Sequence, residues 1–461
     1  MSGHSLADAL SVADSPVDFV RSLGPYADSD HLRIFADLPG EFTNWREEQT
    51  AWKESCALSD LSHHMYDLHV EGPEALDLFA DLGANNFAGF EPGKAKQFVA
   101  TNPDGYLIGD GILFYLGEDE LNLVGYSAIN WVQYHLETGD YDAVATRDDH
   151  GGARDGDPIT FRYQVQGPDA LSVIRDAIDH DLPDVPFFNF RDITVDGHEV
   201  QALRHGMMDE PGFEIFGPWA HADAVRSALL DAGEAYGIQR IGGSAYPTNV
   251  IPTAWIPIPV PAIYSESMSD YQEWLGADTF EGAMTVGGSF VPEDVSEYYL
   301  DPVEAGFERF IDLDHDFVGR DAVRERVENP RRRKVTLVWD GDDTTDVFGS
   351  LFDGGDAAFK YIDLPTPNWA TSMYDRVEQN GETVGRSIAP RYLYFEKTMF
   401  SLGCIDIEWA EPGTEVTLVW GEPGPSSNPR VERHEQKRVR ATVAPAPYYE
   451  DKRKTADYTT I

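Results

Sequence analysis

Hydrophobic and polar positions follow the same order twice in the first two thirds of the chain. The segment Val70-Glu-Gly-Pro-Glu-Ala-Leu76 recurs 95 residues later as Val165-Gln-Gly-Pro-Asp-Ala-Leu171. Each copy predicts a strand that ends near the valine, a glycine turn, and a helix with proline at its first position and an acid near its positive end. A strand-like run and a second helix follow each copy, at residues 121–124 and 127–136, and at residues 213–216 and 221–232. The pattern predicts two related halves.

Two composition changes divide the chain into three parts. Residues 148–157 hold three glycines among several acids, which is typical of a loop. Beyond residues 329–333, short alternating runs separated by turns such as Asn380-Gly381 predict a small β-domain. We expect an α+β protein with a first α/β half at residues 1–150, a second at 151–329, both with ferredoxin-like mixed sheets, and a C-terminal β-barrel-like domain at 330–461. A ligand crevice is expected where the halves meet.

Acidic side chains dominate the composition. The chain of 461 residues carries 81 Asp and Glu against 35 Lys and Arg, a formal charge of −46, yet its 42% hydrophobic content is that of a folded protein. Such a charge argues against nucleic acid and anionic membrane partners. Like charges repel in ordinary buffer, and molar salt screens them. The composition therefore resembles that of haloarchaeal proteins, and we expect a cytoplasmic protein in a high-salt cytoplasm.

Several common mechanisms are not supported by any motif. There is no HExxH zinc motif, and no GxGxxG sequence follows a predicted strand. The segment Gly125-Tyr-Ser-Ala-Ile129 has isoleucine where a serine nucleophile elbow needs its second glycine. The two cysteines, Cys56 and Cys404, form no CxxC pair and are predicted to be buried thiols. We expect neither a metal site nor covalent catalysis.

Three stretches of the chain carry recognisable motifs. They are Trp45 through Leu61-Ser62 to Val70-Glu-Gly-Pro73, then Phe317-Val-Gly-Arg-Asp-Ala322, then Gly381-Glu-Thr-Val-Gly385 through Leu402-Gly403 to Pro412-Gly-Thr-Glu-Val416. Together they resemble the aminomethyltransferase family, which includes the folate-binding T-protein of the glycine cleavage system. The resemblance covers residues 38–421 in preserved order. It implies tetrahydrofolate as the cofactor, bound in the central crevice.

The resemblance also implies which residues contact folate. The turn Asn102-Pro-Asp-Gly105-Tyr-Leu-Ile-Gly109-Asp110 places Asp110 near the reactive nitrogen, with Gly109 where T-proteins usually have another acid. The run Asp209-Glu-Pro-Gly-Phe-Glu214 assigns Glu210 to the pterin, whose parallel donors suit one carboxylate. Both acids could instead be ordinary turn residues. The remaining implied cofactor contacts are Ile112, Phe114, Val124 and Trp255.

One segment departs from T-proteins and resembles the tetrahydrofolate-dependent vanillate and syringate O-demethylases. It reads Gly242-Gly-Ser-Ala-Tyr246-Pro-Thr-Asn249 and leads to Trp255. The resemblance makes Tyr246 the catalytic candidate that stabilises the leaving oxygen, together with Asp110. The implied substrate contacts are His64, Met65, Tyr126 and Phe188. Tyr126 stands where the vanillate-type enzymes are expected to carry an arginine for the substrate carboxylate, so the substrate could lack a carboxylate or not be aromatic.

The resemblance therefore implies an enzyme that moves a methyl group from a small methoxylated donor, expected to be aromatic, to tetrahydrofolate. One alternative is an aminomethyltransferase of the glycine cleavage system or a related amine or sulfonium demethylase. Only the aminomethyltransferase would need a lipoyl carrier protein as partner, and the charge of −46 makes docking to it awkward. A second alternative is a folate-binding protein without turnover, because Gly109 and Tyr126 depart from the family patterns.

Overall fold

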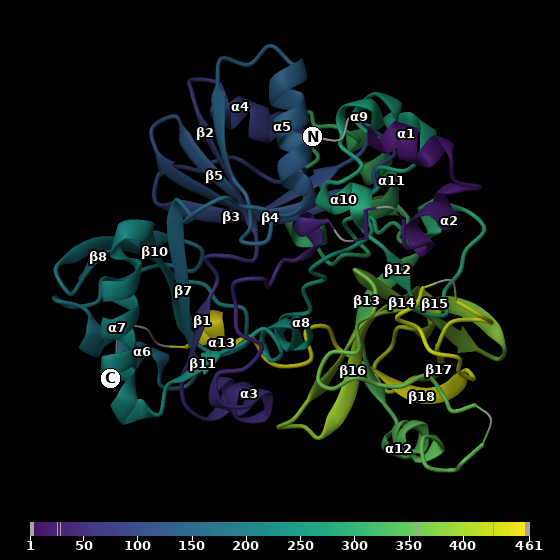
Figure 1. Ribbon diagram of the computed structural model, residues 1–461. Coiled ribbons are helices and arrows are strands. Elements are labelled where there is room, and N and C mark those ends of the chain that lie inside the picture. Colours follow the sequence, from purple (N-terminus) through teal and green to yellow (C-terminus); the bar gives the residue numbers. More distant parts are fainter. Residues whose placement is uncertain (1–3, 25, 28, 356, 427, 457–461) are drawn as a thin grey trace.

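Three bodies surround a common centre in the computed structural model, which describes residues 4–24, 26–27, 29–355, 357–426 and 428–456. Two α/β halves lie side by side, and a β-barrel packs against them (Figure 1). The short helix α8 (Val250–Thr253) lies near the point where the three meet (Figure 1). The predicted fold class is confirmed.

The first half is a five-stranded sheet in the order β3-β4-β5-β2-β6, and every pairing in it is antiparallel, so this sheet is not the mixed one that the sequence predicted. Its strands are β2 (Tyr66–Glu71), β3 (Lys94–Thr101), β4 (Leu107–Gly117), β5 (Glu120–Gly125) and β6 (Val144–Asp148). Helices α4 (Ala75–Leu82) and α5 (Ser127–Thr138) pack on it through apolar side chains such as Phe79, which meets Phe98 edge to face.

The second half repeats this order. Strand β7, helix α6, strands β8, β9 and β10, and helix α7 follow the same sequence as β2 through α5. Their bounds are β7 (Thr160–Gln166), α6 (Ala170–Ala177), β8 (Phe190–Val195), β9 (His198–Leu203), β10 (Gly212–Pro218) and α7 (Ala222–Gly233). Two further strands extend this sheet, β1 (Ala57–Asp60) and β11 (Gln239–Ile241), which pair in parallel. Because β1 precedes the first half in the chain but lies in the second sheet, the chain crosses between the halves at its start.

The repeated glycine has the same role in both copies. Gly72 and Gly167 have φ values of 145° and 138°, and an added Cβ would lie 2.4 Å from the carbonyl oxygen of Asp142 or 2.6 Å from that of Ser55. Only glycine fits such a close backbone approach. The prolines that follow lie in the turn just before each helix, rather than at the first helical position as expected, because two turn residues separate each glycine from its helix.

The connection from the second half to the barrel, residues 242–329, belongs to neither α/β sheet. It begins with 3₁₀-helix η4 (Tyr246–Asn249) and α8 before it becomes irregular and buried. The short elements of this connection and of the N-terminal segment that packs near it are α1 (Leu6–Ser11), α2 (Pro16–Arg21), α3 (Trp45–Glu54), α9 (Ser269–Trp274), α10 (Phe280–Ala283), β12 (Val286–Gly287) and α11 (Arg320–Glu328).

The C-terminal domain is a closed six-stranded barrel. Its strands follow the order β14-β15-β16-β13-β18-β17, and pairing between β14 and β17 closes it. The elements are β13 (Arg332–Trp339), α12 (Gly341–Ser350), β14 (Ser372–Gln379), β15 (Glu382–Leu393), β16 (Thr398–Asp406), β17 (Glu415–Trp420) and β18 (Lys437–Ala444). The predicted turn Asn380-Gly381 joins β14 to β15, with φ values of 54° and 87° that suit a two-residue hairpin.

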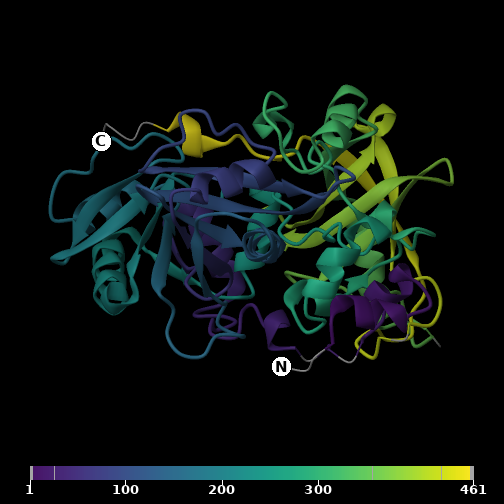
Figure 2. The same ribbon diagram turned by 90° about the horizontal axis from the view of Figure 1, so that it is seen from above.

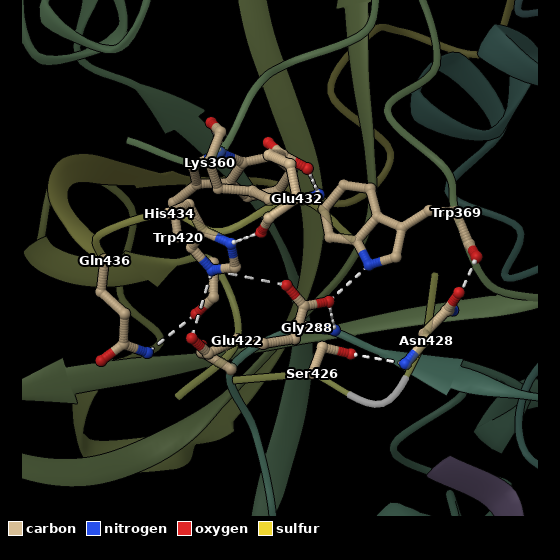
Figure 3. A network of polar contacts seen from close by, with 12 residues as sticks. Gly288, Lys360, Trp369, Trp420, Glu422, Ser426, Asn428, Glu432, His434 and Gln436 are labelled. Carbon is tan, nitrogen blue, oxygen red and sulfur yellow. Dashed lines mark hydrogen bonds and ion pairs between the residues drawn. The ribbon is translucent and has the colours of Figure 1, made fainter. Parts of the chain in front are cut away.

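A polar network fastens the connection to the barrel. The Glu422 carboxylate, just after β17, accepts the backbone N–H of Gly288 at 3.1 Å and the indole N–H of Trp369 (Figure 3). The His434 ring lies beside the same carboxylate at 3.7 Å, and Lys360 pairs with Glu432 nearby. These contacts hold residues 286–288 against the barrel.

After β18 the chain leaves the barrel and returns to the second half, where α13 (Lys452–Thr455) lies (Figures 1 and 2). The backbone N–H of Lys452 donates to the carbonyl of Asp209 at 2.8 Å, and the Arg453 guanidinium donates to the carbonyl of Gly206 at 2.5 Å. The chain end therefore contributes cations to the centre of the molecule. Within the described ranges, no helix has the length and apolarity to cross a membrane.

Candidate active site

Two adjoining cavities occupy the centre of the molecule. The larger, of about 590 Å³, is lined by residues of both halves, the connection, the barrel and α13. The smaller, of about 240 Å³, lies between the connection and the barrel. Four predicted site residues line both: His64, Met65, Tyr246 and Trp255. These four therefore mark the place where the cavities meet.

Asp110 lies on β4 in the wall of the larger cavity. Its carboxylate accepts the indole N–H of Trp255 at 2.7 Å and an amide N–H of Gln97. Burial raises the pKa of Asp110 to about 7, although both bonds and the nearby Lys334 act in the opposite direction. A carboxyl group with this pKa can hold or release a proton near neutral pH.

Lys334, on barrel strand β13, lies in the same cavity. Its ammonium group donates to the carbonyl oxygens of Ala254 at 2.7 Å and Ala305 at 2.6 Å. Burial lowers its pKa to about 8, and the charge of Asp110 opposes this change. The barrel thus places a cation beside the carboxyl group of the first half.

Gly109, where T-proteins usually have an acid, has little space for a side chain. A Cβ there would lie 3.0 Å from the backbone nitrogen of Ala128 and 3.3 Å from the Cβ of Ser127. The start of α5 therefore packs against this glycine, and a side chain would require α5 to shift by a few tenths of an ångström.

Tyr246 and His64 form a hydrogen-bonded pair. The Tyr246 hydroxyl lies 3.2 Å from Nε2 of His64, whose Nδ1 lies 3.2 Å from the carbonyl oxygen of Leu61. Burial lowers the pKa of His64 to about 4, so the ring is neutral at pH 7. Because Leu61 can only accept, Nδ1 carries the proton and Nε2 accepts from Tyr246. Burial raises the pKa of Tyr246 well above its ordinary value, which keeps the phenol protonated and able to donate.

Tyr126 lines only the smaller cavity. Its hydroxyl donates to the carbonyl oxygen of His64 at 2.7 Å, and its ring stacks on Phe280 with centroids 5.0 Å apart. Burial raises its pKa, so this phenol also stays protonated. The residue therefore fixes the backbone of His64 while it forms part of the pocket wall.

Glu210 does not line either cavity. Its carboxylate lies 3.1 Å from the ammonium group of Lys53 and 2.7 Å from that of Lys452. Glu214, four residues later on β10, lines the larger cavity and is buried. Two lysines thus hold Glu210 between α3 and α13, outside both cavities, whereas Glu214 lies in the wall of the larger one.

Glu214 shares a buried arginine with the first half. Arg162, on β7, lies 3.3 Å from Glu214 and 2.5 Å from Asp67 on β2. Burial raises the pKa of Glu214 despite Arg162, whereas Arg162 lowers that of Asp67 in spite of its burial. One guanidinium thus links the two sheets behind the larger cavity.

The other predicted residues form the apolar wall of the larger cavity. They are Ile112, Phe114, Val124 and Phe188. Phe114 packs edge to face on Phe216 at 5.1 Å, which orients this wall. The structure therefore brings together every predicted site residue except Glu210.

Basic residues outnumber acids around the larger cavity, in contrast to the chain as a whole. The acids that line it are Asp110 and Glu214. The basic residues are Lys96, Arg162, Arg309, Lys334, Arg453 and Lys454. None of the six is predicted by a motif in the sequence, where only the excess of basic residues in the C-terminal segment Lys452-Arg-Lys454 could have indicated any of them.

Neither cysteine belongs to the site. Cys56 and Cys404 are buried free thiols, and burial raises the pKa of Cys56 to about 12. Over the part of the chain that the structure describes, no cluster of three or more His, Cys, Asp or Glu side chains is arranged to hold a metal ion.

Comparison with known proteins identifies the class to which this fold and site belong. Residues 16–249 match the model of the GCVT N-terminal domain, and the chain belongs to this family. It is 42% identical to the syringate O-demethylase of Sphingobium sp. (strain NBRC 103272 / SYK-6) over 450 residues, 96% of each chain. It is 29% identical to the sesamin methylene transferase of Sinomonas sp. (strain No.22), over 90% of this chain and 91% of that one. The chain is a one-carbon transferase.

A solved structure supports the fold. The glycine cleavage system aminomethyltransferase T from Bartonella henselae superimposes with a TM-score of 0.60 over 90% of this chain and 92% of that chain, at 17% identity. Both α/β halves and the barrel therefore follow the arrangement expected from the resemblance.

Proposed function

We propose that this protein is a tetrahydrofolate-dependent O-demethylase that transfers a methyl group from a small methoxylated aromatic compound. The observation that carries the proposal is the pair of adjoining cavities that meet at Tyr246 and His64, with Asp110 on the larger one. Two ligands in these cavities would be in contact where the Tyr246 hydroxyl lies. The name of the syringate O-demethylase, to which this chain is similar over nearly its whole length, agrees with this arrangement.

The larger cavity suits tetrahydrofolate in its chemistry. A carboxylate such as Glu214 can accept the two parallel donors of a pterin. The cations Lys96, Arg309, Arg453 and Lys454 can pair with the carboxylates of a glutamate tail, and burial lowers the pKa of Lys96 to about 8. A cavity with acids and an excess of cations fits a ligand that has a donor-rich head and an anionic tail.

The reaction requires two proton movements, and the site has a residue for each. Tetrahydrofolate, when bound, supplies a secondary amine that accepts the methyl group as the carbon–oxygen bond breaks. The Tyr246 hydroxyl, which donates to Nε2 of His64 in the structure, can turn to the departing oxygen and give it a proton, so that the oxygen does not carry a full negative charge. Asp110, with a pKa of about 7, can accept the proton that the amine loses. Return of a proton to Tyr246 through solvent completes the cycle, and the products would be a phenol and a methylated folate.

The proposal is tested by incubation of the protein with tetrahydrofolate and a panel of methyl donors in molar KCl, followed by mass spectrometry. Release of a phenol together with a methylated folate from a methoxylated aromatic supports it. Turnover of only an aminomethyl-lipoyl, amine or sulfonium donor would favour the aminomethyltransferase-type alternative. Folate binding without turnover of any donor would favour a binding protein.

The acid side of the pH–rate profile should report Asp110. A base must be deprotonated, so the rate is expected to fall as the pH drops below about 7, the pKa of Asp110. Asp110→Asn should remove this dependence and lower the rate by about a hundredfold. The measurement is single-turnover methyl transfer between pH 5 and 9. Lys334→Met removes the nearby cation, so the fall in rate should begin at a higher pH in this variant. If the rate still falls below about pH 7 in Asp110→Asn, the pH dependence belongs to a group other than Asp110.

Stability should depend strongly on salt, as we propose for a protein of a high-salt cytoplasm. Its net charge of −46 favours unfolding through repulsion, and molar KCl screens that repulsion. We expect the unfolding temperature to rise by at least about 2 °C, which corresponds to about 1 kcal/mol, from low to molar KCl. Calorimetry at matched pH measures it, and a flat or falling temperature would contradict the salt-adapted interpretation.

A further inference from the structure

The smaller cavity contains a buried arginine that has no acidic partner. Arg391, on barrel strand β15, is 6% exposed and lines this cavity. Its Nε donates to the carbonyl oxygen of Pro247 at 2.8 Å and its Nη1 to that of Pro390 at 2.7 Å. Among the described residues, no carboxylate forms an ion pair with it and Nη2 makes no hydrogen bond. Burial without a counter-charge lowers its pKa to about 10.

The other deeply buried arginines differ from Arg391. Arg162 pairs with Asp67 and Glu214, Arg386 lies 3.0 Å from Glu304, and Arg332 lies 3.2 Å from Asp406. A buried charge is costly unless it is paired. In a chain with 81 acidic residues, a cavity-lining arginine without one indicates that its counter-ion comes from a ligand.

A β-bulge in strand β15 directs the Arg391 side chain toward the cavity. The pairing of β15 with β16 shifts register between Ile388 and Arg391, which is a β-bulge. Ala389 within the bulge has a φ of 52°, a strained conformation for a residue with a side chain. Bulges of this kind are common beside active sites, where they redirect a side chain.

A second unpaired donor lies in the same cavity. The hydroxyl of Thr366 is buried and has no hydrogen-bond partner within the described part of the chain, and Thr366 lines the cavity with Arg391. A guanidinium and a hydroxyl together can bind the oxygens of a carboxylate. Most other lining residues are apolar, among them Ile34, Phe35 and Ile256.

We propose that Arg391 and Thr366 bind the carboxylate of an anionic aromatic substrate whose methoxy group points to Tyr246. The proposal rests on the function proposed above and specifies the substrate class. The cavity of about 240 Å³ is smaller than the range of about 300–1,000 Å³ typical of drug-sized ligands, so it suits one benzene ring. Tyr126, where an arginine was expected, uses its hydroxyl for His64, and the barrel supplies the cation instead. Under this proposal the substrate carries a carboxylate, in contrast to the alternative raised by Tyr126.

The test compares 4-hydroxy-3-methoxybenzoate with 4-hydroxy-3-methoxybenzamide, which has nearly the same shape and no charge. Calorimetry in molar KCl should show the benzoate binding at least about 100-fold more tightly to the wild-type protein. Arg391→Met should abolish this preference by weakening benzoate binding about 100-fold, with benzamide affinity changed less than about 3-fold. Arg391→Lys should keep part of the preference. The control is Lys397→Met, which removes an exposed charge from the same hairpin and should retain the full preference.

Each result decides between this proposal and the proposed function. If the preference for the benzoate depends on Arg391 but no donor is turned over, the anion site stands and the demethylase function fails. If both compounds are demethylated equally by the wild-type protein and by Arg391→Met, the function stands and the anion site is overturned. Should Arg391→Met not fold, equal affinity of the wild-type protein for the two compounds overturns the proposal by itself.

Discussion

Tyr246→Phe is expected to lower the rate of methyl transfer by about a hundredfold or more while the affinity for the methoxylated substrate changes little. Only the hydroxyl is removed, and it is the hydroxyl that lies 3.2 Å from His64 where the two cavities meet. A group that stabilises the leaving oxygen acts mainly in the transition state, so its loss lowers the rate rather than binding. The measurement is single-turnover methyl transfer with saturating tetrahydrofolate.

The packing of Tyr246 makes phenylalanine a fair substitute. Its ring meets His64 and Phe35 edge to face, at centroid distances of 5.0 and 6.2 Å, and phenylalanine keeps these contacts. Asp110→Asn is the contrast, because loss of a charge beside folate should affect cofactor affinity as well as rate. If the rate is unchanged in Tyr246→Phe, Asp110 or a bound water must stabilise the leaving oxygen instead of Tyr246. That result would also weaken the O-demethylase proposal against the aminomethyltransferase alternative.

Glu214→Ala is expected to weaken folate binding by about 2 to 3 kcal/mol, because two pterin donors would lose a charged acceptor. The residue is buried in the wall of the larger cavity, and Arg162 holds it from behind. Glu214→Gln should recover only part of the affinity, since an amide offers one acceptor oxygen and a donor. Calorimetric titration with tetrahydrofolate under anaerobic conditions measures the change.

Glu210→Ala is the matched control for this prediction. The same substitution at the other acid of the run removes two lysine contacts outside the cavity, so it should lower stability while folate affinity stays within about 3-fold. Thermal unfolding of both variants separates the two effects. A loss of affinity in Glu210→Ala with none in Glu214→Ala would restore the assignment made from the sequence.

The sequence predicted the parts of the fold that local chemistry determines. The repeated valine, glycine and proline segments mark real strand–turn–helix units, and Asn380-Gly381 forms the predicted hairpin turn, since both residues tolerate positive φ. The entry of β1 into the second sheet could not be predicted, because its partners lie about a hundred and about 180 residues away along the chain. Pairing at such separations leaves no local pattern.

In the candidate site, too, the residues in local motifs could be predicted and those brought in by tertiary packing could not. Asp110, Tyr246 and Trp255 belong to recognisable motifs, and the structure brings them to one cavity. Glu210 and Glu214 both belong to such a motif and both are buried, and only the position of Glu214 on β10, in the wall of the larger cavity, distinguishes them. Cations such as Lys334 reach the site from distant segments through tertiary packing, and lysines and arginines of this kind look the same in sequence as those on any surface.

The barrel contributes to the two cavities through different strands, Lys334 from β13 to the larger and Arg391 from β15 to the smaller. If Arg391 binds the donor as proposed, changes in the hairpin that carries it would alter which donor is accepted while Asp110 and Glu214 of the α/β halves stay the same. In evolution, such an arrangement would let new donor preferences arise by point substitution in one hairpin, while the residues that handle the one-carbon unit are retained. For protein engineering, the same hairpin is the place to randomise when a new methoxylated compound is to be accepted.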